Sequence, residues 1–145
     1  MRQPSLRRSI EAMVGSPRSR WAAVVLVAAA IFLVSVIPIP RSVPDDGGGV
    51  PTSVLFHFIG YAVLAVLLCF ALFTRRRPLP ANALSLVSAS FYGVLIECVQ
   101  YPISYRSFSY LDMLTNSLGA FCGVLVFSLL LALSEQGGET AADDR

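Results

Sequence analysis

Ionisable and amide side chains interrupt an otherwise apolar stretch of the sequence between Gly93 and Gly123. Such groups are costly inside a bilayer, so their presence there needs a reason. Carboxylates and an imidazole can act as acids or bases, and a guanidinium can hold a phosphate or a carboxylate. The candidate site residues are His57 (the single histidine), Tyr61, Glu97, Gln100, Arg106, Asp112 and Asn116, and the candidates for catalysis are His57, Glu97 and Asp112.

The composition determines which elements must position these residues. The chain has 145 residues, of which 55% are hydrophobic and 14% charged, and this is too apolar for an ordinary soluble domain. A helix needs about 20 apolar residues to cross the hydrocarbon. The sequence therefore predicts an all-α polytopic membrane protein, a bundle of four transmembrane helices. The predicted spans are residues 21–37, 53–73, 81–101 and 111–133, within one domain over residues 21–133.

The arginines predict the orientation of this bundle. All eleven basic residues are Arg, and only Arg41 and Arg106 fall on one side of a four-span arrangement. The positive-inside rule then places both termini in the cytoplasm and the protein in the cell membrane. Residues 1–20 are expected to form a basic cytoplasmic arm, as an interfacial helix or a solvated segment. Residues 134–145 are expected to form an acidic, disordered cytoplasmic tail.

This topology brings the polar residues to one depth. The second and fourth spans descend from the outer surface and the third ascends to it. The start of the second span, the end of the third, the start of the fourth and the loop between the last two therefore share one slab at the outer boundary. That slab contains His57, Glu97, Gln100, Arg106, Asp112 and Asn116.

The helical faces agree with this depth. Glu97 follows Gly93 by four residues, which places both on one stripe of the third span. On the fourth span, Asp112 and Asn116 share a stripe with Gly119 and Gly123. Small residues at this spacing let a neighbouring backbone approach closely in membranes. The stripe is therefore expected to point into the bundle.

The same positions carry a resemblance to a known family. The chain resembles the VanZ-like membrane proteins in His57, in Gly93-Val94-Leu95-Ile96-Glu97 with Gln100, and in Arg106, Ser109, Asp112, Asn116, Gly119-Ala120 and Gly123. It departs from them at Ser53-Val54, where members often have an Asp-Lys pair, and at Pro102, where a loop proline is displaced. The family takes its name from a protein that lowers susceptibility to the glycopeptide antibiotic teicoplanin. The resemblance implies a small integral membrane protein acting at the cell envelope.

Each polar residue also has a purely structural interpretation. Asn116 and Gln100 could form interhelical hydrogen bonds, and Asp112 could cap its helix. Arg106 could be an interfacial loop charge, next to an aromatic belt that includes Tyr105. An unpaired Glu97 costs several kcal/mol, so it is expected to pair with Arg106 or His57 or to take up a proton.

Three classes of function remain open. The first is a site at the outer leaflet that binds the phosphate or carboxylate of a lipid-linked envelope component or antibiotic. The second is an enzyme with His57 as acid or base, oriented by Glu97 or Asp112. The third is a structural bundle locked by the polar cluster. No cofactor, no metal site and no nucleic-acid partner is expected. The expected partners are the bilayer and a lipid headgroup or envelope precursor, and a homo-oligomer with a second copy of the chain is an open alternative.

Overall fold

Four helices make up the computed structural model, which describes residues 16–38, 52–73, 78–106 and 108–143. They are α2 (Pro17–Val36), α3 (Thr52–Leu72), α4 (Pro78–Gln100) and α5 (Tyr110–Asp143), and no strand occurs among the described residues. The predictions for residues 1–15, for the loop of residues 39–51 and for the arginines at 75–77 lie outside the described part. The all-α prediction is confirmed.

Each helix contains a segment that is long and apolar enough to cross a membrane. These segments have 20, 20, 22 and 24 residues in chain order, which corresponds to about 30–36 Å at about 1.5 Å per residue. Their outward faces are apolar: Leu26 is 71% exposed and Phe56 67% exposed. Water would penalise such a surface, whereas lipid tails do not. The prediction of four membrane spans is confirmed.

Two helix boundaries differ from the predicted spans. α2 begins at Pro17, inside the predicted arm, because Ser16 caps it: the Ser16 side chain accepts a hydrogen bond from the Ser19 backbone N–H, and a proline suits the first helical position. α5 continues to Asp143, so the prediction of a disordered segment after residue 133 is wrong for these residues. No proline interrupts the sequence there, and extending an existing helix adds one hydrogen bond for each residue that is ordered.

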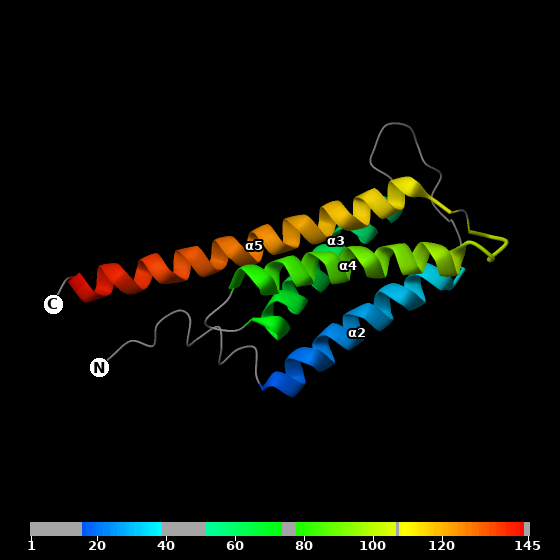
Figure 1. Cartoon of the computed structure of the whole chain (residues 1–145). Coiled ribbons are helices and arrows are strands. Elements are labelled where there is room, and N and C mark those ends of the chain that lie inside the picture. Colours follow the sequence, from blue (N-terminus) through cyan, green and yellow to red (C-terminus); the bar gives the residue numbers. More distant parts are fainter. Residues whose placement is uncertain (1–15, 39–51, 74–77, 107, 144–145) are drawn as a thin grey trace.

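α3 lies at the centre of the bundle and packs against the other three helices, most extensively against α5. α4 contacts α3 and α5 and touches α2 more lightly, while described residues of α2 and α5 form no contact of their own. Figure 1 shows the result, with α3 and α4 between the outer helices α2 and α5. The C-terminal ends of α2 and α4 and the N-terminal ends of α3 and α5 lie at the same end of the bundle. This is the up-and-down arrangement that the predicted spans required.

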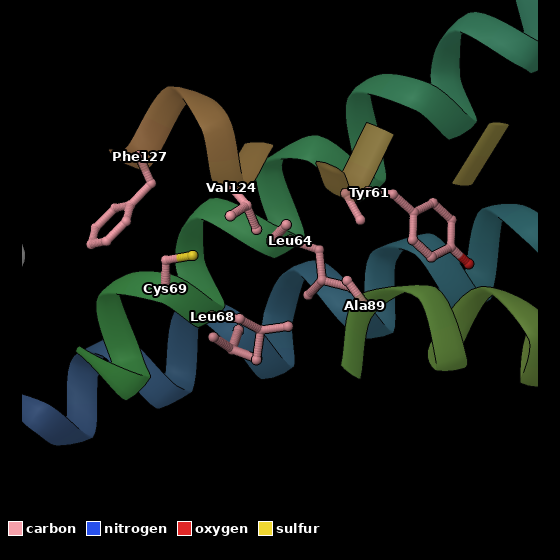
Figure 2. Packing of buried hydrophobic residues seen from close by; sticks show 10 residues of the cluster. Tyr61, Leu64, Leu68, Cys69, Ala89, Val124 and Phe127 are labelled. Atoms are coloured by element: carbon pink, nitrogen blue, oxygen red, sulfur yellow. The ribbon is translucent and has the colours of Figure 1, made fainter. Parts of the chain in front are cut away.

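The apolar core occupies the part of the bundle away from that end. Figure 2 shows side chains from α3, α4 and α5 packed together, including Leu64, Leu68, Ala89, Val124 and Phe127. The Phe127 ring meets Phe70 edge-on at a centroid distance of 4.9 Å. Tyr61 closes the core at the end nearest the polar residues, and its hydroxyl points away from the aliphatic side chains. The core therefore stops where the polar cluster begins.

The close packing of α5 on α3 depends on two glycines. A Cβ built on Gly119 would collide with the carbonyl oxygen of Phe58, and one built on Gly123 would collide with that of Ala62. Both obstacles are backbone atoms of α3, which cannot move aside as a flexible side chain could. The small-residue stripe thus faces α3 directly and sets the depth and rotation of α5 against it.

We expect Gly119→Ala and Gly123→Ala each to lower the free energy of unfolding by about 2 kcal/mol, because the helices must separate to admit the methyl group. Gly60→Ala is the matched control. A Cβ at Gly60 would lie 3.5 Å from the nearest Ile31 side-chain atom, an ordinary contact. Unfolding of the purified protein by sodium dodecyl sulfate in mixed micelles measures the effect. Equal stability of all three variants would contradict this packing.

Candidate functional site

The structure brings the seven predicted site residues to one end of the bundle. Two hydrogen bonds establish this across the helices: His57 of α3 bonds to Asn116 of α5, and Glu97 of α4 bonds to the backbone of Ser109 just before α5. Gln100 and Arg106 reach from α4 and its loop to the end of α2. The shared depth expected from the sequence is therefore present in the structure.

Glu97 lies where the chain enters α5. Its side chain is 0% exposed, and its Oε2 accepts a hydrogen bond of 3.0 Å from the Ser109 backbone N–H. Ser109 is the residue before α5, and its Oγ accepts a hydrogen bond of 3.2 Å from the Asp112 backbone N–H. Free amides at a helix start attract negative charge. Glu97 thus supplies from a neighbouring helix the contact that an acidic residue of the same helix makes in a capping box.

This arrangement changes the roles expected for two residues. Ser109, and not the Asp112 side chain, provides the hydroxyl that caps α5. Asp112 occupies the third position of the helix and is half-buried. Glu97 forms no ion pair with His57 or Arg106, although His57, Arg106 and Asp112 all lie close enough to act on it electrostatically. The single hydrogen bond that its carboxylate accepts from the described residues is the one from Ser109.

His57 is oriented by an amide. The Nδ1 of His57 donates to the Oδ1 of Asn116 at 3.1 Å, so Asn116 takes the place that Glu97 or Asp112 was expected to fill. The Tyr61 ring lies one turn further along α3, stacked at a centroid distance of 6.4 Å from the imidazole. No hydroxyl or thiol of the described residues hydrogen-bonds to His57. The geometry therefore holds the imidazole in place through Asn116.

Three side chains hold the end of α2. Gln100 Nε2 donates to the Ser35 carbonyl at 2.8 Å, Tyr105 Oη donates to Val36 at 2.8 Å, and Arg106 donates to Val34 at 3.1 Å and Ile37 at 3.0 Å. The last four carbonyls of a helix have no partner within it, and a cation is favoured there. We call Gln100, Tyr105 and Arg106 the α2 clamp.

The α2 clamp is held in turn by its own backbone. The N–H of Ile103 donates to the carbonyl of Gln100 at 2.9 Å, and the N–H of Arg106 donates to that of Ile103 at 2.9 Å. These turns aim Tyr105 and Arg106 back at α2. Gln100 and Arg106, predicted as ligand-binding residues, therefore have structural partners already, and their part in binding stays a prediction.

Several buried polar atoms at this end have no hydrogen-bond partner among the described residues. They are Tyr61 Oη, Glu97 Oε1, Asn116 Nδ2 and Arg106 Nε. The side chains of Tyr61, Glu97 and Asn116 are each 0% exposed. A polar group that is buried without a partner is costly, and native proteins contain few of them. We call Tyr61, Glu97 and Asn116, one from each of α3, α4 and α5, the polar triad.

Gly93 shows that the triad converges. A Cβ built on Gly93 would lie 3.1 Å from Asn116 Nδ2 and 3.3 Å from the Tyr61 ring carbon Cε1. Glu97 is one turn further along the same face of α4, and it acts electrostatically on Tyr61. The absence of a side chain at Gly93 therefore lets Tyr61 and Asn116 meet α4 just below the carboxylate.

Sequence reasoning missed several members of this site. The Ser109 N–H and the Tyr105 hydroxyl contact Glu97 and α2 only because of where the loop runs. The hydroxyl of Tyr92 donates to the Ala28 carbonyl of α2 at 2.8 Å, although the sequence around Tyr92 indicates only an apolar span. The sequence does indicate that α2 ends before Pro38, and the carbonyls at that end need hydrogen-bond donors from another segment of the chain. Among the described residues, no group of three His, Cys, Asp or Glu side chains could hold a metal ion.

Comparison with known proteins identifies the family of this chain. The family model VanZ/LLP1 matches residues 21–131, which include α3 and α4, most of the membrane segments of α2 and α5, and every residue of the polar triad. The chain therefore belongs to the VanZ/LLP1 family of membrane proteins. No curated protein and no solved structure matched the chain.

We expect Gln100→Met to lower the free energy of unfolding by about 1–3 kcal/mol, because the Ser35 carbonyl, in a residue that is 2% exposed, loses its donor. Val99→Met is the control, since Val99 is 42% exposed and faces out of the bundle. The thermal midpoint in a fixed detergent compares the two. Identical midpoints would show that the α2 clamp does not stabilise the bundle.

Proposed function

We propose that this VanZ/LLP1 family member binds the polar headgroup of an anionic, lipid-linked envelope molecule at the outer end of its helical bundle. The polar triad is the observation that carries this proposal. Tyr61, Glu97 and Asn116 are fully buried, come from three helices, and each keeps one polar atom unpaired. A structure that served only to lock helices together would pair these atoms with each other, because each unpaired group reduces stability.

The bilayer supplies the route to such a site. Glu97 and Asn116 lie near the ends of segments that span the membrane, Tyr61 lies further in, and the outward faces of the helices around them are apolar. His57 and Asp112, at the edge of the triad, are half-buried rather than sealed. A molecule anchored in the leaflet reaches this depth with its headgroup, while its chains stay among the lipids. Arg106 supplies the positive charge that favours an anionic headgroup.

The outer leaflet is the proposed side of the membrane. The described arginines support it: Arg18 and Arg20 lie at the start of α2, at the opposite end from the triad, and Arg106 is the one described arginine at the triad's end. A positive-inside orientation then exposes the loop between α4 and α5 to the exterior. Binding of an envelope precursor there would link this protein to glycopeptide susceptibility, as the family name suggests.

Labelling of introduced cysteines tests the orientation. Ser104 is exposed in the loop between α4 and α5, and Arg18 is exposed at the start of α2. In a variant without the native cysteines, we expect Ser104→Cys to react with a membrane-impermeant maleimide in intact cells, and Arg18→Cys to react only after permeabilisation. The reverse pattern would place the site on the cytoplasmic side.

Lipid retention tests the binding itself. Asn116→Leu removes the His57 partner and the unpaired Nδ2, whereas Asn82→Leu removes an interhelical bond of 2.8 Å to Ser128. Asn82 lies near the start of α4, away from the triad. Both variants lose one asparagine bond between helices, so they are expected to lose similar stability, by about 0.6 kcal/mol.

Mass spectrometry of lipids that co-purify with the full chain gives the readout. We expect the wild type and Asn82→Leu to retain the same lipid species, and Asn116→Leu to lose at least one of them. Identical lipid profiles for all three proteins would overturn the binding proposal and favour the polar cluster as a structural lock.

A further inference from the structure

The unpaired atoms of the polar triad define what their ligand must offer. Glu97 Oε1 can only accept while the carboxyl is ionised, Asn116 Nδ2 can only donate, and Tyr61 Oη can do both. With Glu97 ionised, a group that satisfies all three must donate one hydrogen bond and accept at least one. We propose that the polar triad binds a hydroxyl of a polyol or sugar headgroup, so that the ligand of the proposed site is a hydroxylated anionic lipid.

Other headgroup chemistries fit the triad less well. A phosphate or carboxylate oxygen only accepts, and it would lie against the buried Glu97 carboxylate, whose one described hydrogen bond comes from Ser109. A quaternary ammonium offers no hydrogen-bond donor, and a primary ammonium offers no acceptor to Asn116 Nδ2. A hydroxyl is the smallest organic group that does both. The charge and the hydroxyl of the ligand must therefore occupy different places.

The α2 clamp indicates where the charge lies. One terminal nitrogen of Arg106 donates hydrogen bonds to the carbonyls of Val34 and Ile37, and its Nε has no partner among the described residues. Arg106 is half-buried in the loop beyond α4, further out than the triad. An anionic phosphoester near Arg106 and a hydroxyl reaching inward to Tyr61 match the order in which a headgroup presents these two groups. This assignment rests on the proposed lipid-binding function.

Two tyrosines of the bundle allow a matched test. The Tyr61 hydroxyl has no hydrogen-bond partner in the described residues, so Tyr61→Phe removes nothing that the fold uses. The Tyr92 hydroxyl donates to the Ala28 carbonyl, so Tyr92→Phe removes a bond between α4 and α2. The rings lie at a centroid distance of 6.3 Å. The two substitutions are chemically identical and close in space, but only Tyr61→Phe alters the triad.

The experiment compares lipids that differ only in the hydroxyls. The full chain is purified in an amine-oxide detergent, because maltoside detergents carry hydroxyls of their own, and is titrated with dioleoyl phosphatidylglycerol, dioleoyl phosphatidylethanol or dioleoyl phosphatidylcholine. Native mass spectrometry measures the bound fraction. We expect phosphatidylglycerol to bind about three- to tenfold more tightly than phosphatidylethanol, which has the same charge and chains but no hydroxyl, as one or more hydrogen bonds would give.

Tyr61→Phe is expected to reduce the preference for phosphatidylglycerol by at least half without lowering the thermal midpoint. Tyr92→Phe is expected to lower the thermal midpoint but to keep the preference. Asn116→Asp, which keeps the Oδ1 facing His57 and replaces the donor, should also lose the preference. Equal binding of the two anionic lipids by the wild type would overturn the proposal. A preference that survives Tyr61→Phe would also overturn it, and an ordered water would then be the partner of the unpaired triad atoms. If neither anionic lipid bound above phosphatidylcholine, the proposed lipid-binding function would fail with it.

Discussion

Backbone groups at the ends of membrane helices must find partners inside the protein, and this constraint organises the polar end of the bundle. At the start of α5, the Ser109 N–H donates a hydrogen bond to Glu97. At the end of α2, the free carbonyls accept hydrogen bonds from the α2 clamp. Both solutions use residues near or beyond the end of α4. That end of α4 and its loop therefore fasten the two outer helices, which share no described contact of their own.

This fastening separates residues that a list of polar positions would treat alike. Gln100 and Arg106 donate hydrogen bonds to carbonyls of α2, and one oxygen of Glu97 accepts a hydrogen bond from Ser109 at the start of α5. What remains is the polar triad, whose spare atoms take no part in holding the helices together. The fold thus holds in place polar atoms that do not contribute to its own hydrogen bonding. Preorganised groups of this kind cost stability in the free protein and are compatible with a binding role.

Sequence patterns predicted the depth of the site and the face of α5, because helix length, arginine distribution and the Gly119–Gly123 spacing each follow from simple rules. They did not predict the pairings. Whether Glu97 meets Arg106 or the Ser109 N–H depends on the rotation of α4 and the path of a short loop, and periodicity gives neither. Tyr105 was assigned to an aromatic belt for the same reason. The continuation of α5 past residue 133 was missed because its polar composition was weighed above the low cost of extending a helix.

The central claim is that the polar triad holds a group of a lipid headgroup. A cryo-electron-microscopy map of the full chain, purified with its native lipids and bound to a rigid antibody fragment, tests this most directly. We expect density of a bound molecule within hydrogen-bonding distance of Tyr61 Oη, Glu97 Oε1 and Asn116 Nδ2, continuous with density that leaves the bundle toward the bilayer. An isolated water peak, or side chains that pair only with one another, would contradict it.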